Sequence, residues 1–451
     1  MPKDSHQNKY FYTRVAFFVL LTLLLAFWGT QDNFPLIAAC YGLFFWQYLR
    51  VYTDVVPKEI NRFLWLGIVL RVLLIFVFPK LSDDIYRFVW DGRLILNGIN
   101  PFDYLPSKII EDGMNIPGLT AELYGQLNSP KYFSIYPPLA QLIYLIGTAL
   151  SPGNIAGSAI VMKTILVGFE IGNIWVITRL LALFERPEKL VLLYALNPLV
   201  IFEVAGNLHF EGMMLFFVLL SVYWLVKERY WWSSVAMALA ISTKLLPLLF
   251  LFFLIGRLGW KRSISYLGMM GVVLVILFLP MLNGVFAAHF GDSLGLYFQN
   301  FEFNSSVVNM LAFLGSFRTK DYLIPVIGPL MAAITFWGIF RVALFEKEYS
   351  WASLFRNMLF AISLYLALTA TVHPWYVILP LGLSLFTDFR YPVLWSGLIV
   401  LSYIKYSPWG AHWNWLAVGV EYSLVYAFAY MEWKGHPFLE RLKNISLGKS
   451  R

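Results

Sequence analysis

Long apolar runs separated by short polar breaks fill most of this sequence, and they restrict its fold more than any motif does. The chain is 59% hydrophobic and only 13% charged, whereas soluble domains carry about 25% charged residues. So few charges cannot cover a water-exposed surface, but apolar helices are stable in a bilayer because they satisfy their own backbone hydrogen bonds. The sequence therefore predicts an all-α polytopic membrane protein.

The apolar runs predict a bundle of about 11–14 transmembrane helices, since about 20 apolar residues cross a bilayer. One integral membrane domain over residues 1–451 is expected, with no separate soluble domain. The candidate spans are 15–30, 34–50, 62–78, 136–151, 158–184, 190–206, 212–227, 231–256, 264–282, 323–345, 353–372, 374–388, 392–404 and 413–431.

The distribution of basic residues predicts the topology. The formal net charge is +8, and basic residues of membrane proteins gather in cytoplasmic loops, so the excess does not indicate a nucleic acid partner. The rule places the N-terminus and the basic tail from Lys434 inside. Residues 79–134, residues 283–304 and His373 are then outside. The single Cys40 excludes an intrachain disulfide.

The first external loop begins with PKLSDDIYRFVWDGRLILNGINPFDY, which is rich in acids directly after an apolar run. A helix over Ile85–Leu96 would place Asp84, Arg87 and Asp91 on one face by their three- and four-residue spacing. The opposite face is apolar, as expected of a helix that lies on a membrane surface. Its acids are then turned toward water or a substrate.

These charged residues also have structural interpretations. Ser82 or Asp83 is a suitable N-cap for the helix, although two adjacent acids exceed what one cap needs. Arg87 and Asp91 are spaced to pair along the helix, which is the favoured interpretation for these two. A carboxylate at the edge of a bilayer can alternatively serve as a general base.

A second polar cluster interrupts the apolar run at residues 197–219. Glu203 falls inside a candidate span, and Asn207, His209 and Glu211 crowd the following break. Ionisable residues at membrane depth are candidates for function because their burial is costly. An ordinary polar loop is the alternative. The His–x–Glu pair lacks a nearby third ligand, so no metal site is predicted.

Two further segments place cations near helix breaks. Lys244 lies deep in the run 231–256, which we expect to form two half-helices that meet near Pro247. A lysine there suits a phosphate; a snorkelling lysine is the alternative. His373 precedes a helix that starts at Pro374, where free N–H groups favour an anion. Trp375 and Tyr376 follow, and a cap with interfacial aromatic residues is the alternative.

The chain contains no P-loop, no Gly-rich dinucleotide motif after a strand and no Ser/His/Asp signature. No nucleotide-dependent cytoplasmic reaction and no cofactor are therefore expected. The acids and cations at an external membrane edge favour a lipid-phosphate substrate, with an acid that deprotonates a hydroxyl and cations that hold the departing phosphate.

Five segments in order resemble the C-type (GT-C) glycosyltransferase superfamily, and most closely bacterial polyprenol-phosphate-mannose-dependent mannosyltransferases. They are SDDIYRFVWDG with GINPF, YPPL, NPLVIFEVAGNLHFEGMM, ALAISTKLLP and HPWYVILPL, over residues 79–381. The resemblance implies a catalytic acid in the first external loop, aligned with Asp83 and alternatively Asp84. Phe210 departs from an HNE-like tripeptide of such enzymes. The expected substrate contacts are Tyr86, Arg87, Asp91, Tyr136, Asn207, His209, Glu211, Lys244, His373, Trp375 and Tyr376.

The function expected from the resemblance is transfer of a hexose, mannose by preference, from a polyprenyl-phosphate sugar to an acceptor hydroxyl, with inversion at the anomeric carbon. The acceptor is a glycolipid, a lipid-linked glycan or a protein, and the location is the external side of a bacterial inner membrane. One rival is a transporter or flippase for a lipid-linked glycan, which also uses buried acids and broken helices. Another is a transferase that acts on lipid A-like acceptors.

Overall fold

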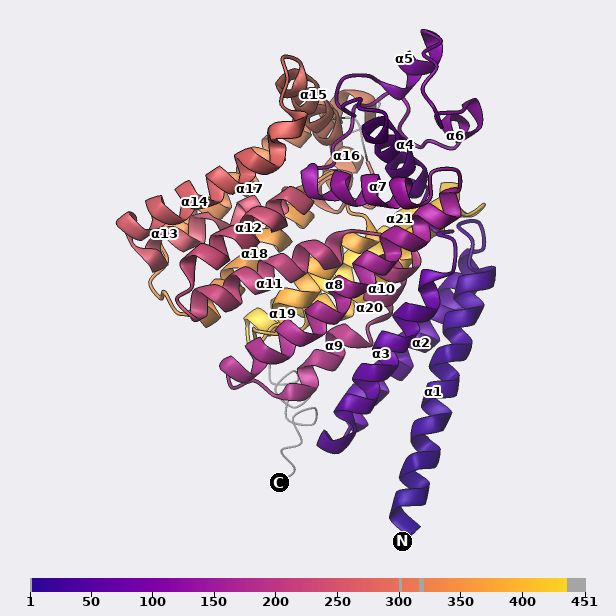
Figure 1. Ribbon diagram of the computed structural model, residues 1–451. Coiled ribbons are helices and arrows are strands. Elements are labelled where there is room, and N and C mark those ends of the chain that lie inside the picture. Colours follow the sequence, from indigo (N-terminus) through magenta and orange to yellow (C-terminus); the bar gives the residue numbers. More distant parts are fainter. Residues whose placement is uncertain (1, 300–301, 316–319, 436–451) are drawn as a thin grey trace.

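Helices dominate the computed structural model, which describes residues 2–299, 302–315 and 320–435 (Figure 1). Within these ranges no strand is formed, and Phe303 and Thr371 make one isolated β-bridge. The largest hydrophobic core is shared by helices from both halves of the chain and includes the fully buried Leu70, Leu166 and Leu219. The basic tail beyond Gly435 lies outside the described residues.

The first half of the chain forms twelve α-helices. They are α1 (Pro2–Trp28), α2 (Phe34–Asp54), α3 (Ile60–Ile75), α4 (Asp84–Leu96), α5 (Pro106–Glu111), α6 (Ala121–Gly125), α7 (Pro138–Leu150), α8 (Ile155–Leu183), α9 (Leu192–Ala195), α10 (Pro198–Val200), α11 (Glu211–Val226) and α12 (Tyr230–Thr243). A π-helix, Ile201–Gly206, follows α10 directly.

The described part of the second half contains α13 (Phe252–Leu258), α14 (Trp260–Phe278), α15 (Phe286–Gln299), α16 (Val307–Gly315), α17 (Lys320–Leu344), α18 (Trp351–Leu368), α19 (Ile378–Ser384), α20 (Tyr391–Leu398) and α21 (Gly410–Trp433). Short 3-10 helices are Pro57–Glu59, Glu188–Val191, Leu246–Phe250, Leu279–Met281, Pro374–Val377 and Ile399–Tyr406.

Five helical stretches among the described residues are long and apolar enough to cross a membrane: Tyr10–Trp28, Ile155–Leu183, Trp260–Met281, Ile327–Leu344 and Trp351–Leu368. The pair Glu188–Ala195 and Pro198–Gly206, bent by 47°, makes a sixth if it is one span. The predicted all-α polytopic membrane protein is confirmed. The number of 11–14 spans stays a prediction, since several apolar helices are shorter.

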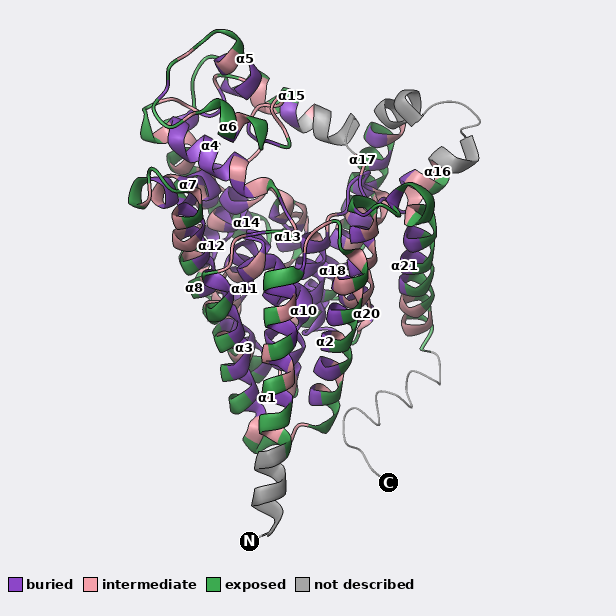
Figure 2. Cartoon of the chain, turned by 90° about the vertical axis from the view of Figure 1, so that its right-hand side faces the viewer, coloured by how far each residue is buried: buried purple, intermediate pink, exposed green. Residues whose placement is uncertain are grey.

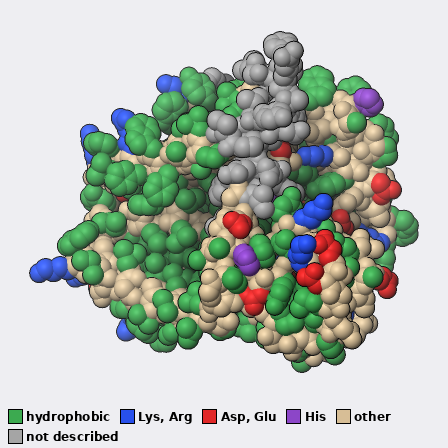
Figure 3. All heavy atoms as spheres, turned by 90° about the horizontal axis from the view of Figure 1, so that it is seen from above, with side chains coloured by type: hydrophobic (Ala, Val, Ile, Leu, Met, Phe, Trp, Pro, Cys, Tyr) green, Lys and Arg blue, Asp and Glu red, His purple; other side chains and the backbone are tan. Residues whose placement is uncertain are grey.

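The segment 79–134 and the N-terminus lie at opposite ends of the molecule. Helices α4, α5, α6 and α15 stand at one end, and α1 begins at the other (Figures 1 and 2). Seen from the loop end, charged side chains gather on the side of α4–α6, while the side of α13 and α14 is mainly hydrophobic (Figure 3). This arrangement agrees with the predicted separation of residues 79–134 from the N-terminus.

Residues 136–151 differ from the expected span. They form α7, which has only 13 residues and lies beneath α4 at the loop end (Figure 1). Thirteen helical residues extend about 20 Å, too short for a hydrocarbon core of about 30 Å. Gly92 allows the close packing of the two helices, because an added Cβ would lie 2.5 Å from the Tyr144 carbonyl oxygen.

The expected break in 231–256 is confirmed. Helix α12 ends at Thr243, Lys244 has an extended backbone with φ −153° and ψ 145°, and a 3-10 helix follows from Leu246 to Phe250. Pro247 cannot donate the hydrogen bond that would continue α12. Because the helix stops at Thr243, the Lys244 side chain lies at the break between α12 and the 3-10 helix.

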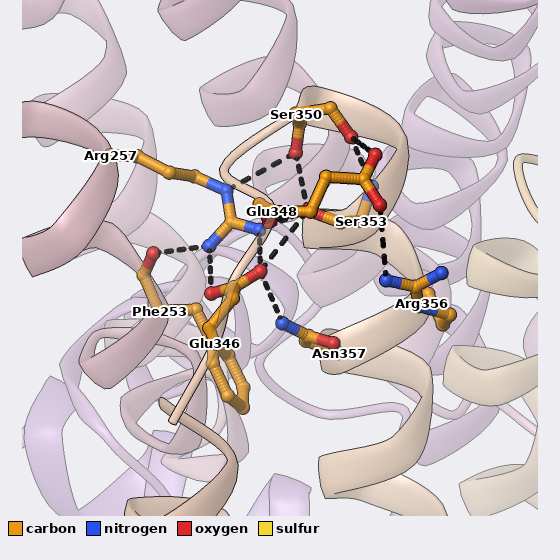
Figure 4. A network of polar contacts seen from close by, with 8 residues as sticks. All are labelled: Phe253, Arg257, Glu346, Glu348, Ser350, Ser353, Arg356 and Asn357. Carbon is orange, nitrogen blue, oxygen red and sulfur yellow. Dashed lines mark hydrogen bonds and ion pairs between the residues drawn. The ribbon is translucent and has the colours of Figure 1, made fainter. Parts of the chain in front are cut away.

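A buried ion pair joins the end of α13 to the segment between α17 and α18 (Figure 4). The Arg257 guanidinium contacts the Glu346 carboxylate, and the two side chains are 1% and 5% exposed. Arg257 also donates to the Phe253 carbonyl and the Ser353 hydroxyl, and the Asn357 amide donates to Glu346. This network ties the segment before α18 to α13.

Loss of this ion pair should destabilise the fold. Arg257→Met leaves the Glu346 carboxylate buried without a cation, a change that costs about 3–5 kcal/mol when a buried pair is broken. We expect a clear fall in the melting temperature of the detergent-solubilised protein. The matched control is Arg356→Met, because Arg356 pairs with Glu348 at 3.7 Å on the surface with 52% and 63% exposure. That loss should cost about 0–1 kcal/mol. Equal falls in melting temperature for the two variants would contradict a stabilising role for the Arg257–Glu346 pair.

Candidate active site

A cavity opens between the external loop and the broken helices of the bundle. It encloses about 870 Å³ of space, including its open mouth. Its walls come from the start of α4, the segment 128–136, the break after α12 and the start of the 3-10 helix at Pro374. Seven residues predicted from the sequence line it together: Asp84, Arg87, Tyr136, Lys244, His373, Trp375 and Tyr376.

The two adjacent acids have different positions. Asp84 lies in the first turn of α4 and lines the cavity, where its Oδ1 accepts a hydrogen bond of 2.9 Å from the Asn128 amide. Asp83 occupies the N-cap position but makes no side-chain capping bond; the Ser82 hydroxyl accepts instead from the Asp84 N–H, at 3.3 Å. Asp83 is exposed and is not among the residues that line the cavity.

Asp83 nevertheless has an altered acidity. Partial loss of hydration raises the pKa of its carboxyl group, and the negative charge of Asp84 adds to this effect. A raised pKa is a property of general bases, so Asp83 is still a candidate for the general base. The position of Asp84 within the cavity is the stronger argument, because a base must reach the proton that it removes.

Arg87 and Asp91 pair along α4, as their spacing predicts. Arg87 Nε lies 2.8 Å from Asp91 Oδ1. Asp91 is fully buried and also accepts from the Ser134 hydroxyl and the Gln141 amide, at 2.6 and 3.0 Å. The expectation that the acids of this face turn toward water or substrate is therefore wrong for Asp91, which holds Arg87 and the segment before α7 in place.

The Arg87 guanidinium keeps a donor for a ligand. Its Nη1 donates to the carbonyl oxygens of Ser129 and Tyr132, at 3.2 and 2.9 Å. Its Nη2 is buried and has no hydrogen-bond partner in the described part of the chain. An unsatisfied buried donor costs about 1–3 kcal/mol, and Arg87 lines the cavity, so an anion in the cavity can recover this cost.

Lys244 contacts a buried acid and also reaches the cavity. Its ammonium group forms an ion pair with Glu211, which is fully buried at the start of α11, and it lies 5.5 Å from the ring centre of Tyr376. Lys244 thus neutralises a buried acid, Glu211. Its side chain is still 19% exposed and lines the cavity.

Aromatic rings stack along one wall of the cavity. Trp375 lies between His209 and His373, with ring centres 3.5 and 4.4 Å apart. Phe303 stacks on the other face of His373, at 4.7 Å. Burial lowers the pKa of His373 well below its usual value, and the positive charges of Lys244 and Lys405 act in the same direction. His373 therefore faces the cavity as a neutral imidazole.

The remaining predicted contacts lie outside this cavity. Tyr86 packs against Phe78, with ring centres 6.2 Å apart. Asn207 lines a second, more apolar pocket bordered by Leu25, Leu74 and Val400. His209 and Glu211 are buried behind the cavity wall. Among the described residues, no three His, Cys, Asp or Glu side chains lie close enough together to hold a metal ion.

Sequence reasoning did not select several residues that complete the site. Asn128 and Ser134 come from a loop whose motif signal is weak, although a segment leading into Tyr-Pro-Pro could have drawn attention to it. Tyr403 donates a hydrogen bond of 2.6 Å to Glu203 from 200 positions along the chain. Phe303 enters the stack through its bridge to Thr371. No local pattern marks either residue.

Comparison with known proteins identifies the family of the chain. Residues 16–259 match the family model of the alpha-(1->6)-mannopyranosyltransferase N-terminal domain, the MptA/B family. The chain belongs to this family. The match confirms the resemblance to mannosyltransferases and covers Asp84, Arg87, His209 and Lys244, whereas His373 lies beyond it.

One curated relative is alpha-(1->6)-mannopyranosyltransferase A of Corynebacterium glutamicum, which is 25% identical over 187 residues. The aligned region is 40% of this chain and 36% of the relative. The chain thus matches about a third of that protein's length.

Proposed function

We propose that the protein is a mannosyltransferase that takes mannose from a polyprenyl-phosphate donor and transfers it to an acceptor hydroxyl, with inversion. One observation carries the proposal: a single cavity, at the loop end of a membrane-embedded chain of the MptA/B family, is lined by Asp84, Arg87 and Lys244. A carboxylate and two cations are the groups that such a transfer requires.

Asp84 is the proposed general base. The acceptor hydroxyl gives its proton to the Asp84 carboxylate while its oxygen bonds to the anomeric carbon. The bond from that carbon to the phosphate oxygen breaks, and its electron pair leaves with the polyprenyl phosphate. Asp84 is the only carboxylate among the described residues that line the cavity. Retaining enzymes commonly use a second carboxylate as nucleophile, so the single acid favours one displacement and inversion.

Arg87 and Lys244 are the proposed ligands of the donor phosphate, with His373 beside them as a neutral hydrogen-bonding group. A phosphate oxygen fits the unpartnered Arg87 Nη2, and charge-assisted bonds of this kind are worth about 1.5–3 kcal/mol. These contacts also stabilise the phosphate as it departs, when its negative charge increases. The polyprenyl chain remains in the bilayer, which explains why the site lies at the end of membrane helices.

Replacement of Asp84 tests the base. Asp84→Asn keeps the side-chain shape but removes the proton acceptor, so kcat should fall roughly 10²–10⁴-fold. The measurement is transfer of labelled mannose from polyprenyl-phosphate mannose to a panel of glycolipid, lipid-linked glycan and peptide acceptors. Asp83→Asn is the matched variant one position away and should reduce kcat less. Near-normal turnover by Asp84→Asn together with loss in Asp83→Asn would move the base to Asp83.

Replacement of Lys244 tests the phosphate site. Lys244→Met alone leaves Glu211 buried and unpaired, which should lower stability by up to about 3 kcal/mol. The double variant Lys244→Met/Glu211→Gln removes both charges and should recover most of that loss. Donor affinity of the double variant should still fall roughly 10–150-fold, because about 1.4 kcal/mol corresponds to a factor of ten. Glu211→Gln alone is the control. Unchanged donor binding in the double variant would end the phosphate role of Lys244.

The external location of the cavity is testable by cysteine labelling. Lys108 and Ala288 are exposed at the loop end, and Glu188 is exposed near α9 at the other end. In a Cys40→Ala background, a membrane-impermeant thiol reagent added to intact cells should label Lys108→Cys and Ala288→Cys. Glu188→Cys should react only after the membrane is opened. The reverse pattern would place the cavity on the cytoplasmic side.

A further inference from the structure

His209 lies directly behind the proposed base, and its contacts differ from those of a histidine that only fills space. Its Nε2 is 3.9 Å from Asp84 Oδ2. This nitrogen is buried and has no hydrogen-bond partner within the described residues, although the side chain is only 1% exposed. A phenylalanine would stack equally well on Trp375 without this cost of about 1–3 kcal/mol. The buried, unpartnered nitrogen therefore needs an explanation beyond packing.

The other ring nitrogen fixes the tautomer. His209 Nδ1 lies 3.1 Å from the Glu203 carbonyl oxygen and 3.1 Å from Glu203 Oε2. Both atoms are acceptors, so Nδ1 carries the proton, and in the neutral ring Nε2 is left with a lone pair. That lone pair faces Asp84. The arrangement gives Asp84 a neighbour that can accept a proton.

Glu203 is itself held firmly. The Tyr403 hydroxyl donates to its Oε1 at 2.6 Å, and the Asn207 amide donates to its Oε2 at 3.2 Å. Glu203 is 3% exposed, and in such surroundings an anionic carboxylate stabilises a positive imidazolium more strongly than it would in water. Glu203 can therefore balance the charge that His209 acquires with a proton.

The backbone is specifically shaped to bring these groups together. Glu203 lies in the π-helix Ile201–Gly206, a rare form that is frequent at functional sites. Leu208 follows with φ +67°, a left-handed conformation that is costly for a bulky residue. The turn brings His209 back over Glu203, so that the His209 N–H also donates to the Glu203 carbonyl oxygen, at 3.0 Å.

We propose that His209 is a positioning residue that accepts the substrate proton from Asp84, with Glu203 as its orienting and charge-balancing partner. This inference rests on the proposed mannosyl transfer. In the first step the acceptor O–H bond breaks and its proton goes to Asp84 Oδ2. In the second step that proton moves to His209 Nε2, which restores the Asp84 carboxylate and leaves an imidazolium between two acids. After product release the proton returns through Asp84 to water at the cavity mouth.

The gap of 3.9 Å closes through a small movement of Asp84. Its side chain is 19% exposed and is held on one oxygen by the Asn128 amide, so a change in this one contact frees it. Catalytic hydrogen bonds are commonly long without substrate and shorten in the complex. Since Trp375 fixes the plane of the His209 ring by stacking, we expect the Asp84 carboxylate to move and not the ring.

Other titratable groups near His209 are few and identifiable. Asp84 faces it from α4, and Glu203 from the π-helix. His373 lies beyond the Trp375 ring, and burial lowers its pKa well below the usual value. Lys244 and Glu211 form their own ion pair. His209 is therefore the group that links the Asp84 carboxylate to the Glu203 carboxylate.

The test compares pH profiles of kcat for the full-length protein with polyprenyl-phosphate mannose at saturation. His209→Gln should lower kcat roughly 10²-fold and leave the donor KM unchanged. Glu203→Gln removes the charge that balances the proton on the imidazolium. The acid limb of kcat should then move to lower pH, by roughly 1–2 units. A merely structural role would lower kcat equally at every pH and raise KM.

Two further variants keep the test decisive. His209→Asn retains an amide donor for Glu203 and lacks Nε2, so its kcat should fall as that of His209→Gln does. The kcat of each variant is calculated per folded molecule, and the number of folded molecules is measured by donor binding. Glu421→Gln is the matched control, because Glu421 is a fully buried acid that accepts from Trp395 and Asn304. The acid limb of the kcat profile should be the same in Glu421→Gln as in the wild-type protein.

The possible failures are distinguishable. If the wild-type protein transfers no mannose to any acceptor, the proposed function falls, and this inference falls with it. If the wild-type protein transfers mannose but the two His209 variants keep full kcat, or Glu203→Gln leaves the acid limb in place, only the role of His209 is overturned.

Discussion

The ion pair between Arg71 and Glu170 supports the segments on which the site is built. Both side chains are fully buried, and Arg71 Nε lies 3.0 Å from Glu170 Oε2. The Arg71 Nη1 also donates to the Ala195 carbonyl oxygen at 2.6 Å, and Glu170 Oε1 accepts from the Tyr194 hydroxyl at 2.7 Å. Charges so deep are tolerated only with partners, so α3, α8 and α9 must meet in one arrangement.

This pair also fixes the start of α11. The Asn173 amide donates both to Glu170 Oε1 and to the Gly212 carbonyl oxygen, at 3.0 and 2.7 Å. A Cβ on Gly212 would lie 2.2 Å from Glu170 Oε1, so only glycine allows α11 to begin there. Glu211 and His209 immediately precede this contact, and their positions are set by it. A buried charge outside the cavity thus positions the residues behind the cavity.

A second buried cation determines where the external loop begins. Lys163 on α8 donates to the carbonyl oxygens of Leu74 and Val77 at the end of α3. The Leu74 carbonyl also accepts from the Val77 N–H, at 3.2 Å, and a cation at the C-terminal end of a helix is favourable for the helix dipole. The sequence shows Lys163 and Glu170 seven residues apart on one helix, but each has a separate partner from α3. The chain therefore leaves the bundle just before Asp83 and Asp84.

The sequence predicted the local features of the site well, since these depend on neighbouring residues. The helix over Ile85–Leu96, the Arg87–Asp91 pair and the break after Thr243 all follow from spacing or from proline chemistry. The partner of Lys244 and the orientation of His209 could not be predicted. The first joins residues 33 positions apart, and the second depends on a π-helix and a left-handed Leu208, which no residue pattern specifies. The short length of α7 and its close packing on α4 could not be predicted either, because they depend on a contact between two separate helices.

The pairing of the cavity cations has a consequence for binding. Arg87 is bonded to Asp91 and Lys244 to Glu211, so the cavity wall does not hold two uncompensated positive charges, which would cost several kcal/mol each. A phosphate that enters the cavity then contacts cations that are already held in place, so binding loses little side-chain entropy. The same acids limit the attraction, because each cation is partly neutralised before the phosphate arrives. A site of this kind favours the phosphate as its charge increases in the transition state, yet still allows the lipid phosphate to leave.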